Sequence, residues 1–165
     1  KAQADTAVTW SAKESRSEVQ LLTDRILILV EKANGAVQFL SRDGKKLLAE
    51  NPSEPRLLLD SQTWNFFAWD KNERLKSKGV LADDFMDLST KARYISFGKK
   101  KLRMPLVLSN KGYAIGVAAG STVLFCNVRT YGQYIYTQGT GQIDYYFIYD
   151  ENQERNIEQY RNLPV

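Results

Sequence analysis

Apolar and polar residues alternate along most of the chain, which is the pattern of β-strands. The densest apolar stretch runs from Met104 to Tyr149. Within it, the alternation and the interposed turn residues predict strands over 104–108, 113–117, 122–128 and 143–149. Turn residues at Ser109–Gly112 and Gly120–Ser121 separate these strands. The stretch predicts an antiparallel meander in the middle of a β-sandwich, because few of its positions suit contact with water.

The strand over 113–117 has a large and a small side. Tyr113, Ile115 and Val117 point one way, while Ala114 and Gly116 point the other. Small side chains let another layer approach closely. We therefore expect this part of the sheet to be covered on both sides.

The first third of the chain has the same alternation and predicts an all-β meander. Asn34-Gly35 is its sharpest turn signal, because both residues accept the positive φ of a type I′ hairpin. Strands are expected over 8–10, 19–22, 25–31, 36–40 and 46–49.

The middle of the chain is less regular. Strands are expected over 57–59, 63–69 and 93–97. Residues 70–87 are charged and interrupted by Gly79, and they predict a long surface loop. Loops of this length in a compact domain are usually functional or mobile.

The one exception to the strand pattern is at the C-terminal end. Asp150 is expected to be the N-cap of a short helix that extends to about Asn162 and stops at Pro164. Gln153 occupies the capping-box position, and Ile157 and Tyr160 share one face. The predicted fold is an all-β antiparallel sandwich with a short C-terminal helix, forming a single domain over residues 1–165.

Composition excludes several kinds of chemistry. The chain has no histidine, which removes Ser-His-Asp and Cys-His sites and the usual zinc ligand sets. Its one cysteine, Cys126, lies in an apolar strand pattern and is expected to be a buried small hydrophobe. No cofactor or metal is expected. A net charge of +4 with both signs interspersed does not call for nucleic acid, and no apolar run reaches membrane-spanning length.

Three groups of residues offer candidate chemistry. Lys99–Lys101 with Arg103 could bind phosphate, although a solvated hairpin tip explains them more simply. Asp70, Asp83, Asp84 and Asp87 could supply the paired carboxylates of a glycosidase, although acids on a solvated loop normally behave independently. The third group is aromatic and could stack on sugar rings or pack in a core or interface: Trp64, Phe66, Phe67 and Trp69, with Tyr131, Tyr134 and Tyr136 beside Gln133 and Gln138.

Three stretches, in order, resemble the N-terminal domain of glycoside hydrolase family 31, the α-glucosidase and α-xylosidase group. Leu21 to Asn51 resembles that domain's opening hairpins, which carry a D-G-K-x-L turn. Arg103 to Ala118, RMPLVLSNKGYAIGVA, is similar to the family's I-P-F-L-L-S-S-K-G-Y-G segment. Tyr145 to Pro164 is similar to the strand and helix that lead to Y-R-x-L-T-G.

The resemblance implies a galactose mutarotase-like β-sandwich that packs on a (β/α)₈ barrel following Val165. In that family the nucleophile and the acid/base are barrel aspartates, so the resemblance carries no catalytic residue into this chain. The chain departs from the family at its G-L-G-E segment, where it reads Glu73 to Gly79, and after K-G-Y, where Ala118-Ala119 replace a tryptophan and an acid or amide. The true mutarotases of this fold use a histidine acid, which this chain lacks.

The resulting hypothesis is a non-catalytic β-sandwich domain of a retaining α-glycosidase. Its partners would be the catalytic barrel of the same chain and a carbohydrate substrate, with no nucleic acid and no membrane. The 70–87 segment would reach the rim of the active site, with Trp69, Asp70, Asp83 and Asp84 as candidate substrate-binding residues. A free-standing carbohydrate-binding module is the main alternative, and a basic domain that binds a polyanion through Lys99 to Arg103 is a weaker one.

Overall fold

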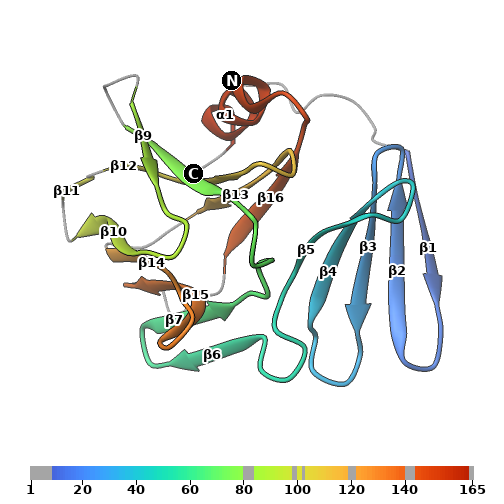
Figure 1. Ribbon diagram of the computed structural model, residues 1–165. Helices are drawn as coiled ribbons and strands as arrows, with labels where there is room; N and C mark the ends of the chain where they lie inside the picture. The colour runs from blue at the N-terminus through green and yellow to red at the C-terminus, as the bar shows by residue number, and fades with distance from the viewer. Residues whose placement is uncertain are drawn as a thin grey trace. The chain divides into compact units, whose positions relative to one another are not determined.

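The computed structural model describes residues 9–79, 84–97, 100–101, 103–118, 122–139 and 144–163 (Figure 1). The chain divides into two compact units, Lys1–Pro55 and Arg56–Val165. The expectation of one domain over residues 1–165 stays a prediction.

The first unit is a five-stranded antiparallel sheet in which each strand pairs with the next along the chain, in the order β1-β2-β3-β4-β5. This confirms the expected meander. The first strand was expected to end at Trp10, but it begins there and continues to Glu14. The polar run Ser11–Glu14 pairs with β2 although it has no hydrophobic alternation, so the sequence pattern did not predict it. Its strands are β1 (Trp10–Glu14), β2 (Glu18–Thr23), β3 (Ile26–Glu31), β4 (Val37–Ser41) and β5 (Lys46–Ala49).

The turn between β3 and β4 is not the expected type I′ hairpin. Gly35 has a positive φ of 73°, but Asn34 does not. The side chain of Asn34 is used instead: its Oδ1 accepts from the Ala36 amide at 2.9 Å, and its Nδ2 donates to the Pro52 carbonyl at 2.7 Å. Asn34 therefore stabilises the turn through its side chain and not through a positive φ. The Asn-Gly pair in the sequence does not distinguish these two roles.

The second unit contains two antiparallel sheets and the helix, which confirms the all-β sandwich with a short C-terminal helix (Figure 1). The six-stranded sheet has the order β11-β10-β14-β15-β7-β6 and the five-stranded sheet the order β16-β13-β12-β8-β9. Their strands are β6 (Arg56–Leu59), β7 (Gln62–Phe66), β8 (Leu75–Gly79), β9 (Phe85–Asp87), β10 (Ala92–Phe97), β11 (Lys100–Lys101), β12 (Arg103–Ser109), β13 (Tyr113–Val117), β14 (Thr122–Val128), β15 (Gly132–Gln138) and β16 (Tyr145–Tyr149).

The expected meander over Met104 to Tyr149 is wrong in its pairing, although its strands are present. β13 pairs with β12 and β16, whereas β14 pairs with β10 and β15 in the other sheet. The chain therefore changes sheets between β13 and β14. Alternation reports which residues are buried, and both sheets bury one face against the same core, so the pattern does not reveal the change.

The expected loop over 70–87 is also wrong in part. β8 pairs with β12 on one side and with β9 on the other, so this segment forms a hairpin within the five-stranded sheet. Most of β8 is buried, including Ser77 and the mostly aliphatic side chain of Lys78. The strand was not predicted because small and charged residues occupy its buried positions, where the strand pattern expects apolar ones.

The strand β13 is buried along its whole length, which confirms that a layer covers each side. On one side the helix α1 (Gln153–Arg161) packs through Ile157 and Tyr160 against β12, β13 and β16. A side chain at Gly116 would not fit, because its Cβ would lie 2.5 Å from the Tyr160 ring. The small side of β13 is what allows the helix to approach the sheet.

The N-cap of the helix lies two residues later than expected. Its N-cap is Asn152, whose side chain accepts from the Glu154 amide at 3.0 Å. Asp150 is buried and its carboxylate accepts from the Asn152 amide at 2.9 Å, so it orders the approach to the helix and does not cap it.

Candidate functional site

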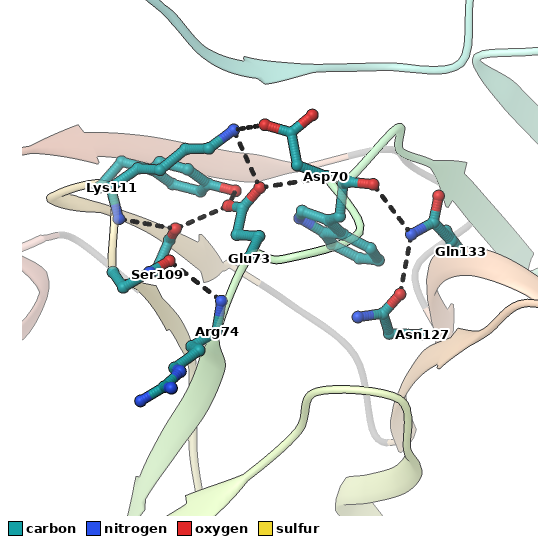
Figure 2. A network of polar contacts seen from close by, with 10 residues as sticks. Asp70, Glu73, Arg74, Ser109, Lys111, Asn127 and Gln133 are labelled. Carbon is teal, nitrogen blue, oxygen red and sulfur yellow. Dashed lines mark hydrogen bonds and ion pairs between the residues drawn. The ribbon is translucent and has the colours of Figure 1, made fainter.

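A buried carboxylate, Glu73, links the start of the β8–β9 segment to the turn between β12 and β13 (Figure 2). Its Oε1 accepts from the Ser109 hydroxyl at 2.6 Å and from the Tyr113 hydroxyl. Its Oε2 lies 3.1 Å from the Lys111 ammonium and accepts from the Asp70 amide at 3.2 Å. These contacts of the carboxylate are hydrogen bonds and an ion pair, which is the condition for keeping a charge in a protein interior.

Lys111 lies between two carboxylates, Glu73 and the half-exposed Asp70 (Figure 2). Burial opposes the charge of this ammonium, but the hydrogen bond to Asp70 and the charge of Glu73 outweigh burial, so the pKa of Lys111 is raised. Burial, with the charge of Glu73 as the next cause, raises the pKa of Tyr113 well above its usual value. Tyr113 is therefore a neutral donor and Lys111 a cation at neutral pH.

The backbone ties the same two segments together. The Arg74 amide donates to the Asn110 side chain at 3.0 Å, and the Asn110 amide donates to the Arg74 carbonyl at 3.1 Å. With the contacts of Glu73, these bonds hold residues 70–74 against the 109–113 turn. The position of the β8–β9 hairpin is thus determined by a polar network and not by loop sequence alone.

A hollow of about 320 Å³ lies beside this network, which is within the size range of small-molecule sites. Its lining combines apolar side chains, charged side chains of both signs and two amides. The Lys76 ammonium lies over the Phe85 ring, 4.1 Å from the ring centroid. The hollow is lined by Arg74, Leu75, Lys76, Phe85, Asp87, Asn110 and Gln153.

Asp87 is the one carboxylate among these lining residues. The hydrogen bond from the Ser89 amide, at 3.0 Å, is the first cause that lowers the pKa of Asp87. The group is therefore a charged acceptor at neutral pH. A hollow with cationic donors, a charged acceptor and amides can hold a hydroxyl-rich or zwitterionic small molecule by hydrogen bonds.

The structure separates the four candidate substrate-binding residues. Asp70 belongs to the Lys111 network. Asp84 lies in the β8–β9 hairpin, where its backbone carbonyl accepts a hydrogen bond from the Gly79 amide at 3.0 Å. Trp69 is 5% exposed, with its ring 5.0 Å from both Phe67 and Phe125, which favours the packing interpretation. Asp83 lies outside the described residues. That these residues bind substrate stays a prediction.

Apart from Asp70, the residues that build the network and the hollow were not among those four candidates. Their signal was present in the segment Ser109 to Tyr113, which carries the family-like S-x-K-G-Y sequence. In the sequence, Glu73 stood out only as the first residue of the stretch that differs from the family's G-L-G-E segment. Lys76 and Phe85 carry no signal of their own, because their role depends on the pairing of β8 with β9.

A second feature is the side of the six-stranded sheet that points away from the five-stranded one, which we call the uncharged face. Cross-strand partners share a face of a sheet, and the central row of this face carries Trp64 beside Tyr136. These rings are 4.9 Å apart, and those of Phe66 and Tyr134 are 5.8 Å apart. Its three rows are Leu57, Trp64, Tyr136, Leu124 and Tyr94; Phe66, Tyr134, Cys126 and Ala92; and Leu59, Gln62, Gln138 and Thr122.

The structure locates some other sequence candidates. Cys126 is buried, as expected. Lys99 lies outside the described residues, as do the side chains of Lys100, Lys101 and Arg103, so the basic-patch hypothesis stays a prediction. Within the described ranges there is no group of three or more Cys, Asp or Glu side chains that could hold a metal ion. The one described helix is too short and too polar to cross a bilayer.

Comparison with solved structures finds this fold as a part of several longer chains. A dextranase of glycoside hydrolase family 31 from Flavobacterium johnsoniae, complexed with glucose, matches with a TM-score of 0.77 and 17% identity over 92% of this chain and 20% of its own. A cycloalternan-forming enzyme from Listeria monocytogenes matches with a TM-score of 0.78 and 16% identity over 96% of this chain and 18% of its own.

A third match is a family 31 α-xylosidase from a soil metagenome, complexed with xylose, with a TM-score of 0.74 and 17% identity over 96% of this chain and 27% of its own. The chain thus spans about a fifth to a quarter of the length of these enzymes, and what it shares with them is the fold. No protein-family model and no curated protein matches the chain.

Proposed function

We propose that this chain is a non-catalytic, galactose mutarotase-like β-sandwich region of an α-glycosidase, which packs on a catalytic barrel in the same polypeptide. One observation carries the proposal: nearly the whole chain superposes on a minor part of a dextranase, a cycloalternan-forming enzyme and an α-xylosidase. The sequence resemblance to the N-terminal domain of family 31 supports the same assignment.

The chemistry of the site is consistent with a supporting role. Hydrolysis of a glycosidic bond ordinarily needs two carboxyl groups at a set separation. The hollow has one carboxylate among its lining residues, Asp87, and Glu73 is buried in hydrogen bonds and an ion pair. The role that fits these groups is binding, with the β8–β9 hairpin held at the rim of the barrel's active site by the Glu73 network.

Activity in the natural-length polypeptide tests the proposal. Aryl α-glucosides and α-xylosides should be hydrolysed by the longer chain and not by residues 1–165 alone. In the longer chain, Phe85→Ala should raise KM several-fold while leaving the fold intact, because Phe85 is a 40% exposed ring at the hollow.

Tyr131→Ala is the matched control, since Tyr131 is an exposed ring on the turn after β14. It should leave the kinetics unchanged. Hydrolysis by residues 1–165 alone would overturn the non-catalytic assignment, and no hydrolysis by the longer chain would overturn the glycosidase assignment. Equal effects of the two substitutions on KM would contradict the proposed contact between the β8–β9 hairpin and the substrate.

A further inference from the structure

The uncharged face is unusual for this chain. A quarter of all residues are Asp, Glu, Lys or Arg, and the solvent side of a sheet normally carries several of them. None of the thirteen residues in its three rows is charged. In the described part of the second unit, the helix packs on the other sheet and not on this one.

Aromatic rings form the centre of this face. Trp64, Phe66, Tyr134 and Tyr136 are all half-buried, because each ring packs against the ring on the neighbouring strand. Rings supported in this way are held in place before any ligand arrives, so little side-chain entropy is lost when one binds. Tyr94 extends the central row on β10 and is 47% exposed.

Hydroxyls and amides accompany the rings. The face carries the phenols of Tyr94, Tyr134 and Tyr136 and the amides of Gln62 and Gln138. An apolar partner would take these polar groups out of water, which costs free energy. A charged partner would find no opposite charge among these thirteen residues. A ligand that is uncharged, rich in hydroxyls and apolar on its ring faces satisfies both conditions.

We propose that the uncharged face binds a neutral oligosaccharide chain, with Trp64 and Tyr136 stacking on its sugar rings. Strands lie about 4.8 Å apart, so the central row from Leu57 to Tyr94 spans roughly 19 Å across five strands. A row of this length accommodates several linked sugars. The ligand is therefore an oligosaccharide and not a single sugar.

The three tryptophans provide the assay. Trp64 lies on the uncharged face, Trp69 is buried in the core and Trp10 is 65% exposed in the first unit. Residues 1–165 are titrated with isomaltohexaose and maltohexaose, with glucose for comparison, and binding is followed by tryptophan fluorescence and calorimetry. At least one hexasaccharide should bind, and glucose should bind more weakly than that hexasaccharide.

Substitutions then locate the site. Trp64→Ala should weaken hexasaccharide binding about tenfold or more, since stacked rings commonly contribute of that order. Tyr94→Ala, at an exposed position where unfolding is not expected, should weaken it by a smaller factor. Trp10→Ala is the matched control and should bind as the unaltered chain does.

Three results would overturn the inference. The first is no binding of either hexasaccharide, and the second is a loss of binding in Trp10→Ala as large as in Trp64→Ala. The third is self-association of residues 1–165 in sedimentation that Tyr94→Ala abolishes, which would assign the face to a second copy of the chain. The inference does not depend on the barrel, so failure of the hydrolysis assays of the longer chain would not contradict it. Failure of the binding assays would likewise not contradict the glycosidase assignment.

Discussion

The two units bury their apolar residues to different degrees. The first three strands of the first unit contain no buried residue, although Ile26 to Val30 is a continuous apolar run. In the second unit, β13 is buried along its whole length, with a layer on each side. Similar strand sequences thus give three strands without a buried residue in one unit and the centre of a layered core in the other. Apolar sequence makes the strands, and a second layer makes the core.

The largest expected effect of this difference is on independent folding. Three of the five strands of the first unit contain no buried residue, which leaves little buried surface to offset the entropy of ordering the sheet. Residues 56–165, produced alone, should unfold cooperatively on heating, whereas residues 1–55 alone should show no cooperative transition by circular dichroism. Cooperative unfolding of residues 1–55 would show that the half-buried sheet is sufficient by itself, and the contrast between the units would fail.

The next effect concerns charges. Glu73→Ala removes the partner of Ser109, Tyr113 and Lys111 inside the second unit, and it should lower the free energy of unfolding by about 3–5 kcal/mol. Glu14→Ala is the matched control, because Glu14 pairs with Lys32 at the exposed edge of the first unit.

The control should be close to neutral in urea denaturation, since exposed ion pairs contribute little. If Glu73→Ala lowered the free energy of unfolding by less than about 1 kcal/mol, the Glu73 network would stabilise the fold no more than an exposed ion pair does. The position of the β8–β9 hairpin would then need another explanation.

The smallest effect is on pH dependence. Tyr113 and Lys111 have raised pKa values in the fold, so their contribution to stability is fully present below their unfolded pKa values, about 10 and 10.4. It is lost as the pH rises through the folded values. In the first unit Glu14 and Asp43 have lowered pKa values, so their contribution is lost as the pH falls.

Residues 56–165 should therefore lose stability above about pH 10, the unfolded pKa of tyrosine. In Tyr113→Phe the alkaline decline should be smaller, although the variant starts from a lower stability because Glu73 loses a donor. Urea titrations at successive pH values measure both slopes, and identical slopes would contradict the role given to Tyr113.

The sequence predicted most strands of both units and the meander of the first unit, but not how the strands of the second unit pair. Alternation over 104–108, 113–117 and 122–128 identified three strands, because it reports burial. It could not report that β13 and β14 belong to different sheets, since both bury one face against the same core. The strand Leu75–Gly79 was missed because buried Ser77 and Lys78 imitate a loop, and their burial depends on partners in β12 and β9.

The candidate site was predictable to a smaller extent. The sequence identified Asp70 and the Ser109–Tyr113 turn, both parts of the Glu73 network, without connecting them. Those residues are about forty positions apart, and only the pairing of β8 with β12 brings them together. The uncharged face is similar: its aromatic residues were recognised, but alignment into rows required the registers of β7, β15 and β14.

The change of sheet between β13 and β14 has a consequence for biosynthesis. β13 receives its second partner, β16, only when Tyr145–Tyr149 has been made, after the whole β14–β15 hairpin. Until then a nascent chain carries an apolar strand with one free edge, and such edges invite pairing with other chains. Chains interrupted before Tyr145 should therefore aggregate during translation, and synthesis of β16 is the step that closes this edge.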